Sequence, residues 1–218
     1  AQMRMRTMSL WESKESNGKV SLASLFEGDA DVAAISDLTI EGLAYATCRG
    51  GWPASTKLKE KAALRVARNY VEEVINYDVH RVDGVDKNTT RVRKLLESYA
   101  RNISTMAANE TIMADVRATD QTISPNTFAI YLSALRRIFI VDDVPAWSPA
   151  LRSKTKIRTS PKRHFVDPSI AVALMGTNPQ GLLKDFPTFG FLFEDLCARD
   201  LRVYAQAQNL FTFTKFSG

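Results

Sequence analysis

The sequence predicts a mainly α protein. A helical domain precedes a winged helix-turn-helix with a short β-wing, and a truncated α+β segment follows at the C-terminus. Two observations lead to this prediction. Several long stretches repeat apolar residues at one-turn spacing between capping residues, and the spacing becomes strand-like after residue 138. With 218 residues, 45% of them hydrophobic, the chain is long enough for two domains and a buried core.

Three helices are predicted in the N-terminal part. Ser21, Ser36 and Thr56 are residue types that favour helix N-caps, and each precedes a stretch with helical spacing. Glycines end the first two stretches, as is typical of helix C-termini. The three helices are expected at 21–28, 36–50 and 56–80.

Three further helices are followed by two short strands. Ser124-Pro125 is the strongest start signal, because a capping side chain is followed by proline at the first helical position. Three helices and then two strands joined by a loop is the element order of a winged helix-turn-helix. The helices are expected at 89–104, 109–118 and 125–138, the strands around 139–147 and at 163–166, the basic loop at 150–161, and later helices at 168–175, 182–185 and 189–207.

Positive charge is concentrated in one part of the chain. The formal net charge is +5, yet residues 1–144 hold equal numbers of basic and acidic residues. Residues 145–165 contain six basic residues and no acidic one. A polyanionic partner is therefore expected to meet the chain there. The six cations are Arg152, Lys154, Lys156, Arg158, Lys162 and Arg163.

In this interpretation the helix 125–138 is the recognition helix. Asn126, Ser133 and Arg137 lie on its outer face, where residues that read bases would be needed, but Ile130 lies between them. The basic loop is the better candidate, because such loops bind phosphates without reading sequence. The sequence leaves a second interpretation open, in which the loop is solvated and the domain packs against protein.

Signals for catalysis are weak. Residues 51–57 resemble a phosphate-binding loop but lack the glycine that precedes its lysine. His80, Cys48 and Cys197 are each more typical of a helix end or a buried position than of a catalytic site. Glu194-Asp195 lacks the further acids and the lysine of a carboxylate metal site. We therefore expect no enzyme activity and no cofactor in this chain.

The location of the protein follows from what the sequence lacks. The first residues carry charge without the apolar run of a signal peptide, and no apolar run approaches the roughly 18 residues of a membrane helix. Two cysteines cannot form a disulfide framework. We expect a cytoplasmic protein that does not insert into a membrane.

Several motifs, taken in order, resemble a large bacterial and archaeal family of AAA+-type ATPases. Residues 8–26 resemble the final part of the ATPase core, and Gly50-Gly51-Trp52-Pro53 resembles the signature that opens the C-terminal domain of unknown function. Residues 124–135 and 161–167 resemble the family's winged-helix core. Residues 190–194 are similar to the motif that leads into a nuclease-like fold.

The resemblance implies that this chain is the C-terminal region of an ATPase whose ATP and Mg sites precede residue 1. The nuclease-like pattern expected after residue 206 is missing. The implied role is DNA binding through the basic wing. The alternative is docking to a protein partner, self-association, or intramolecular regulation without nucleic acid. The implied segments are the end of the ATPase core at 1–35, a helical domain at 36–85, the winged helix-turn-helix at 86–167 and a truncated nuclease-like domain at 168–218.

Overall fold

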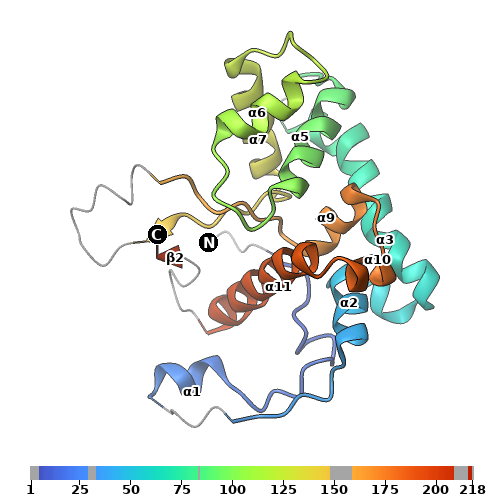
Figure 1. Cartoon of the computed structure of the whole chain (residues 1–218), viewed down its shortest axis with the longest axis vertical. Helices are drawn as coiled ribbons and strands as arrows, with labels where there is room; N and C mark the ends of the chain where they lie inside the picture. The colour runs from blue at the N-terminus through green and yellow to red at the C-terminus, as the bar shows by residue number, and fades with distance from the viewer. Residues whose placement is uncertain (1–4, 29–32, 83, 148–158, 209–215, 218) are drawn as a thin grey trace.

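The computed structural model describes residues 5–28, 33–82, 84–147, 159–208 and 216–217. This part of the chain is mainly helical, which confirms the predicted class at that level (Figure 1). A 3-10 turn, η1 (Ser55–Lys57), precedes the helix at Glu60–Glu73, and a π-helical turn, η2 (Val74–Asp78), joins that helix to the short one at Val79–Arg81. The helices are α1 (Leu22–Phe26), α2 (Ile40–Arg49), α3 (Glu60–Glu73), α4 (Val79–Arg81), α5 (Thr89–Arg101), α6 (Asn109–Arg117), α7 (Pro125–Arg137), α9 (Pro168–Met175), α10 (Pro179–Lys184) and α11 (Phe186–Ala207).

Two helices begin later than the sequence predicts. The N-cap of α2 is Thr39, whose hydroxyl accepts the Gly42 N–H at 3.1 Å, so Ser36 is not the cap. The N-cap of α3 is Lys59, because Thr56 lies within η1. Each true cap, Thr39 or Lys59, has an extended backbone and lies beyond the first residue of a capping type, and before α3 the chain first makes the 3-10 turn η1.

The helices α5, α6 and α7 lie together at the top of Figure 1. Ser124 caps α7 as predicted, and its hydroxyl accepts the Thr127 N–H at 3.1 Å. Asn88 caps α5 in the same way, through the Arg91 N–H at 3.0 Å. Asn109 is not the cap of α6 but its first residue, so its side chain is available for a different contact.

The predicted β-wing is not present as a two-stranded sheet. Val141 and Val144 form isolated antiparallel bridges with Phe165 and Lys162. Pro145 and Pro161 lie directly beside the outer bridge, and a proline cannot donate a hydrogen bond to a ladder. The assigned strands of the described residues are β1 (Ala146–Trp147) and β2 (Phe216–Ser217), which pair in parallel.

The α+β segment expected after residue 168 is also not seen. Residues 168–208 form α9, α10 and α11, and β2 adds only two residues of strand. The helix α11 is longer than predicted because it begins at Phe186, with Asp185 accepting the Thr188 N–H at 3.1 Å. In Figure 1, α11 crosses the molecule below α9.

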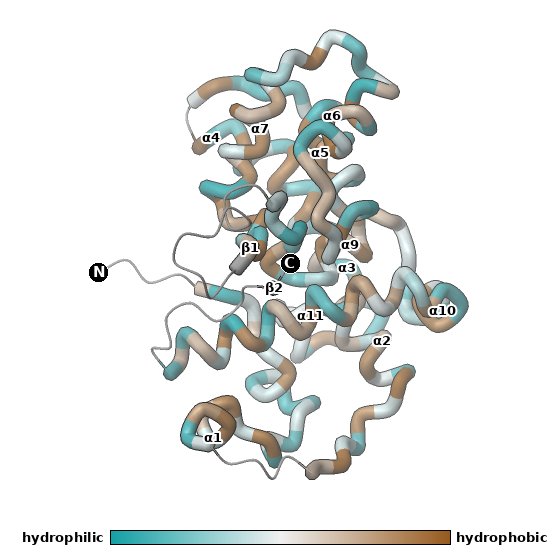
Figure 2. Tube along the Cα trace, turned by 60° about the vertical axis from the view of Figure 1, so that its left-hand side comes forward, coloured by the Kyte–Doolittle hydropathy of each residue, from teal (hydrophilic) through white to brown (hydrophobic). Residues whose placement is uncertain are grey.

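One hydrophobic core joins most of the chain. It runs without interruption from Ala44 and Cys48 of α2 through Leu96 of α5 and Leu135 of α7 to Leu192 of α11. Figure 2 shows apolar residues on α5, α7 and α9, and α5 packs against α9. The predicted segment boundaries remain predictions. No helix in the described part of the chain combines the length and apolar character needed to cross a membrane.

Candidate nucleic-acid interface

The outer face of α7 is arranged as the sequence predicts. Phe128, Leu132 and Leu135 are buried in the core. Asn126, Ser133 and Arg137 are exposed on the opposite face. The Arg137 guanidinium donates to the Val82 carbonyl at 3.2 Å, and Ile130 remains 43% exposed between the polar residues. The face therefore offers three polar side chains around an apolar one.

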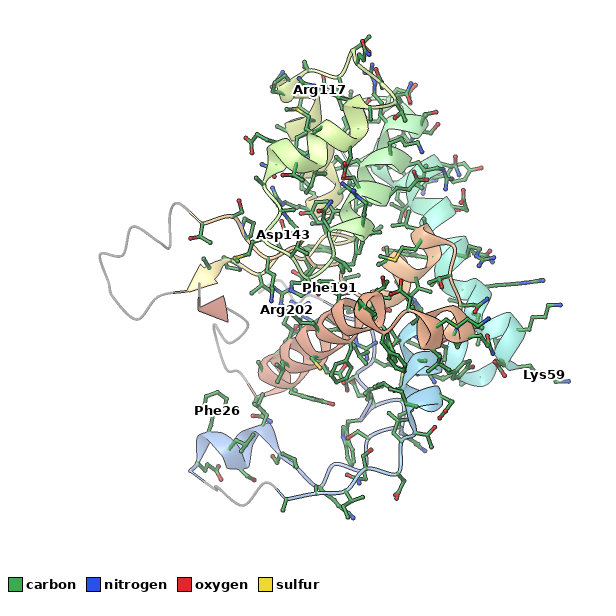
Figure 3. All side chains as sticks on the ribbon, viewed as in Figure 1. Phe26, Lys59, Arg117, Asp143, Phe191 and Arg202 are labelled. Carbon is green, nitrogen blue, oxygen red and sulfur yellow. The ribbon has the colours of Figure 1, made fainter. Side chains whose placement is uncertain are left out.

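Arg163 does not lie on the surface, so the expectation that it contacts phosphate is wrong. It is 1% exposed, and its Nε donates to the Ala107 carbonyl at 2.8 Å. Its two terminal nitrogens donate to the Tyr99 hydroxyl at 3.0 Å and to Asn109 Oδ1 at 2.9 Å. The guanidinium also lies 3.2 Å from Asp143, which is labelled in Figure 3. Arg163 therefore holds the loop 104–109 against the segment after α7.

Lys162 is also occupied within the fold. Its ammonium group pairs with Glu194 of α11, and the side chain is 24% exposed. Its backbone exchanges two hydrogen bonds with Val144, at 2.8 and 2.9 Å. A phosphate would have to displace the Glu194 carboxylate to reach this lysine.

The remaining four predicted contacts are Arg152, Lys154, Lys156 and Arg158. They lie outside the described residues, in the segment 148–158, which we call the basic segment. Its sequence contains these four cations and no acidic residue. Its two ends are placed, because Trp147 lies in β1 and Lys162 pairs with Val144. The basic segment therefore connects two chain segments that run antiparallel.

The glycine pair of the predicted signature forms a tight buried contact. Gly50 has a φ of 73°, and a side chain there would clash with the Ser169 hydroxyl. A side chain at Gly51 would clash with the Met8 carbonyl. The Gly51 N–H donates to Asp167 at 2.9 Å, and the Trp52 indole donates to Ser169 at 2.9 Å. The signature thus connects the N-terminal arm to the start of α9.

A buried ion-pair cluster extends from this contact to α11. Arg199 is 3% exposed, and it pairs with Asp167 at 3.1 Å and with Asp200 at 2.7 Å. Burial alone would raise the pKa of Asp167, but the Arg199 charge and hydrogen bonds from Ser169 and Gly51 outweigh burial and lower it. Burial raises the pKa of Asp200 in spite of Arg199. The Asp200 carboxylate also accepts the Leu10 N–H at 3.0 Å.

A second buried pair lies close to this cluster. His164 Nδ1 is 2.6 Å from Asp195 Oδ1, and both side chains are nearly inaccessible. The other oxygen, Oδ2, is buried and has no hydrogen-bond partner among the described residues. Burial raises the pKa of Asp195 although His164 lowers it. We call Asp167, Arg199, Asp200, His164 and Asp195 the buried charge cluster.

The other residues considered for chemistry occupy supporting positions. His80 Nδ1 accepts the Lys87 N–H at 3.0 Å at the end of α4. Cys48 is buried, which raises the pKa of its thiol to about 12, and burial raises the pKa of Cys197 to about 11. The described residues contain no group of three or more His, Cys, Asp or Glu side chains placed to hold a metal ion.

Sequence reasoning did not find the buried charge cluster. A signal was present, because Asp195, Arg199 and Asp200 interrupt an apolar helical pattern at positions that would face the core. Charged residues are almost never fully buried unless they are paired. Asp167, directly after the partly apolar run at 163–166, was the available partner.

The sequence was also compared with known proteins. The model of a family described as a domain of unknown function (DUF8612) matches residues 40–181. No curated protein and no solved structure matches the chain. The match runs from the first residue of α2 into α10 and includes the glycine signature, α7 and Asp167. The chain therefore belongs to the DUF8612 family, and most of its core lies within the family's domain.

Proposed function

We propose that residues 86–167 are a winged helix-turn-helix module that binds the phosphate backbone of duplex DNA through the basic segment. The observation that carries the proposal is a sequence of four cations without an acid at 148–158, between two segments that form antiparallel bridges directly after three helices. Arg/Lys-rich loops of this kind contact phosphates without reading the bases.

The backbone pattern around Arg163 adds support. Residues 162 and 164 bond to the segment after α7, while Arg163 exchanges bonds of 2.7 and 2.8 Å with Ser104 and Thr105. A segment directly after the first helix that bonds in this way to the residues expected to form the last strand is compatible with a winged helix. The exposed Asn126, Ser133 and Arg137 would then face the groove.

The resemblance extends this proposal to the parent protein. In that extension the chain is the C-terminal region of a bacterial AAA+-type ATPase in the cytoplasm, and ATP and Mg are bound by the preceding part. The chain itself would have no catalytic site and no cofactor. It would bind DNA and respond to the nucleotide state of the parent. Binding of Mg-ATP to this chain at micromolar concentration, measured by calorimetry, would contradict that division.

The DNA proposal can be tested by the salt dependence of binding. If the four cations of the basic segment reach phosphates, the slope of log affinity against log salt should be roughly −3 to −4, from about −0.9 per contact. Changing Lys154, Lys156 and Arg158 together to Gln should flatten it by about 2 to 3 units. Fluorescence anisotropy with two unrelated duplexes measures this, and both duplexes should be weakened alike.

The control removes three charges elsewhere, at the exposed Lys14, Lys19 and Arg81. If this control flattens the slope as much as the basic-segment variant, the contacts are not local. Arg137→Ala tests the helix separately. It should change the preference between the two duplexes, because base contacts and not phosphate contacts carry sequence information.

A second candidate function is docking to a protein, and the exposed face of α11 favours it. Phe186, Phe193 and Leu201 lie on one side of this helix and are 59%, 43% and 42% exposed. Aromatic residues are enriched in the centres of protein interfaces. Docking would leave affinity for duplex DNA near background at about 50 mM salt, where phosphate contacts are strong.

A further inference from the structure

A second cationic surface lies on η1 and α3, far from the basic segment in sequence. Five basic residues occur within residues 57–68, and all five side chains are exposed. We call them the cationic stripe. Lys59 is labelled in Figure 3, where its side chain extends from the edge of the molecule into solvent. The members of the stripe are Lys57, Lys59, Lys61, Arg65 and Arg68.

Helical geometry places the last three on one line. Successive residues of an α-helix turn by about 100°, so Lys61, Arg65 and Arg68 project within an arc of about 60°. This arc lies opposite Ala63 and Ala67, which are buried. From Lys61 to Arg68 the helix rises about 10.5 Å. Duplex DNA presents about six phosphate charges over that length.

The stripe is not neutralised within the fold. In the part of the chain that the structure describes, no carboxylate lies within ion-pair distance of these five side chains. Glu72, one turn beyond Arg68, is paired with Arg93 at 2.6 Å. Burial raises the pKa of Tyr45 in α2, and the negative charge of Glu60 raises it further. Like charges at helical spacing repel, so the stripe is destabilising without a partner.

The start of α3 adds to the positive potential. Lys59 is the N-cap but makes no side-chain capping bond, and Lys57 and Lys61 lie on either side of it. The N-terminus of a helix carries partial positive charge, so cations are unfavourable there and an anion is favourable. The stripe therefore combines five side-chain charges, offset in the first turn by Glu60 alone, with the field of a 14-residue helix.

We infer that the cationic stripe binds the phosphate backbone of a nucleic acid without reading its sequence. A protein partner fits less well, because Leu58 is the large apolar side chain exposed within the stripe and protein interfaces favour aromatic residues over lysine. A membrane fits less well too, because the apolar side of α3 is buried against α2 and α9 and cannot insert.

This inference does not rest on the proposed function of the basic segment. In Figure 1, α3 lies at one edge of the molecule, whereas β1, at one end of the basic segment, lies at the opposite side. The stripe would therefore be a second polyanion contact, separate from the first. The net charge of residues 1–144 does not reveal the cationic stripe, because acidic residues elsewhere in that range balance its positive charge.

The test compares three variants with equal charge loss, using fluorescence anisotropy with one labelled duplex at several salt concentrations. Changing Lys61, Arg65 and Arg68 together to Gln should flatten the salt slope by about 2 to 3 units, from about −0.9 per contact. Changing Lys14, Lys19 and Arg81 to Gln is the matched control and should leave the slope unchanged. The exposed positions of all six predict that both variants fold, with the thermal midpoint of the α3 variant equal to or above that of wild type because repulsion is relieved, which circular dichroism verifies.

The variant of Lys154, Lys156 and Arg158 separates the two proposals. If it alone flattens the slope, the inference about the stripe is overturned and the proposed function stands. If the α3 variant alone flattens it, the inference stands and the proposed function fails. A labelled oligoglutamate peptide is the second probe. Loss of peptide affinity in the α3 variant, with its DNA slope equal to that of the control, would overturn the inference in favour of an acidic protein.

Discussion

The buried charge cluster and the cationic stripe use the same kinds of residue in opposite ways. In the cluster, Arg199 is almost inaccessible and lies between two carboxylates, and backbone N–H groups complete the coordination of those carboxylates. In the stripe, Arg65 and Arg68 are exposed, and the carboxylate nearest along their helix face, that of Glu72, is paired with Arg93 instead. A charge that is taken out of water must be paired inside the fold, whereas an exposed charge can be left to a ligand.

The comparison separates charge that supports the fold from charge that can bind a partner. Arg163 and Arg158 are near in sequence, and both lie in the stretch 145–165, which contains six basic residues and no acidic one. Burial moves Arg163 into the first group, where its guanidinium binds Tyr99, Asn109 and Ala107. Net charge along the chain therefore overstates the cations that are available to a polyanion.

The largest expected effect comes from breaking the buried charge cluster. Arg199→Met leaves Asp167 and Asp200 without their cation, which should lower the free energy of unfolding by about 3–5 kcal/mol. Urea denaturation measures the change. The matched control is Arg101→Met, because Arg101 pairs with Asp115 at 2.6 Å but is 67% exposed. The control should cost less than about 1 kcal/mol, and equal losses would show that burial does not distinguish the two pairs.

Arg163→Met should have the next largest effect. It removes the hydrogen bonds to the Ala107 carbonyl and to Tyr99 and Asn109, and should lower the free energy of unfolding by about 2–3 kcal/mol. The salt slope of DNA binding should equal that of the wild-type protein, measured below the unfolding transition. If Arg163→Met instead flattened the salt slope by about 0.9, the value of one phosphate contact, and left the free energy of unfolding unchanged, Arg163 would belong to the DNA interface.

A smaller effect should depend on pH. Because burial raises the pKa of Asp195 in the folded state, the folded protein keeps this proton after the unfolded chain has lost it. The free energy of unfolding should therefore fall as the pH rises from about 4 through the raised pKa. Asp195→Asn has no such proton, so this variant should gain stability relative to wild type between pH 4.5 and 8. Urea denaturation at several pH values checks this, and a constant difference would contradict it.

The smallest effect concerns the stripe. Lys59→Ser places a capping hydroxyl at the N-terminus of α3, where no side chain now caps, and should raise the free energy of unfolding by about 1 kcal/mol. Thermal denaturation measures it, and affinity for duplex DNA should fall at the same time. A stabilised variant with unchanged DNA affinity would exclude Lys59 from the contact.

Local signals predicted the helices well. Ser124-Pro125 fixes the start of α7 because capping and the proline ring both act within one turn, and the core face of α7 follows from its period. The starts of α2 and α3 were predicted three residues early, because Ser36 and Thr56 are capping types that the chain does not use as caps. Which of several residues of a capping type becomes the N-cap depends on how the helix packs in the fold, and the local sequence does not contain that information.

The candidate interface was only partly predictable. Exposure of Asn126, Ser133 and Arg137 follows from helical spacing and is confirmed. Burial of Arg163 could not be read from its neighbours, because its partners Tyr99 and Asn109 are 64 and 54 residues away. The cationic stripe needed the position of α3 against α2 and α9, which decides which of its faces meets water.

Lysine acetylation followed by mass spectrometry, with and without duplex DNA, tests the division of charges most directly. The account predicts that Lys57, Lys59 and Lys61 become protected by DNA, as do Lys154 and Lys156 of the basic segment. Protection should weaken as salt increases. Lys14 and Lys19 should label equally in both samples. Protection of Lys14 and Lys19 to the same degree as the stripe, or no protection of the stripe at about 50 mM salt, would contradict the account.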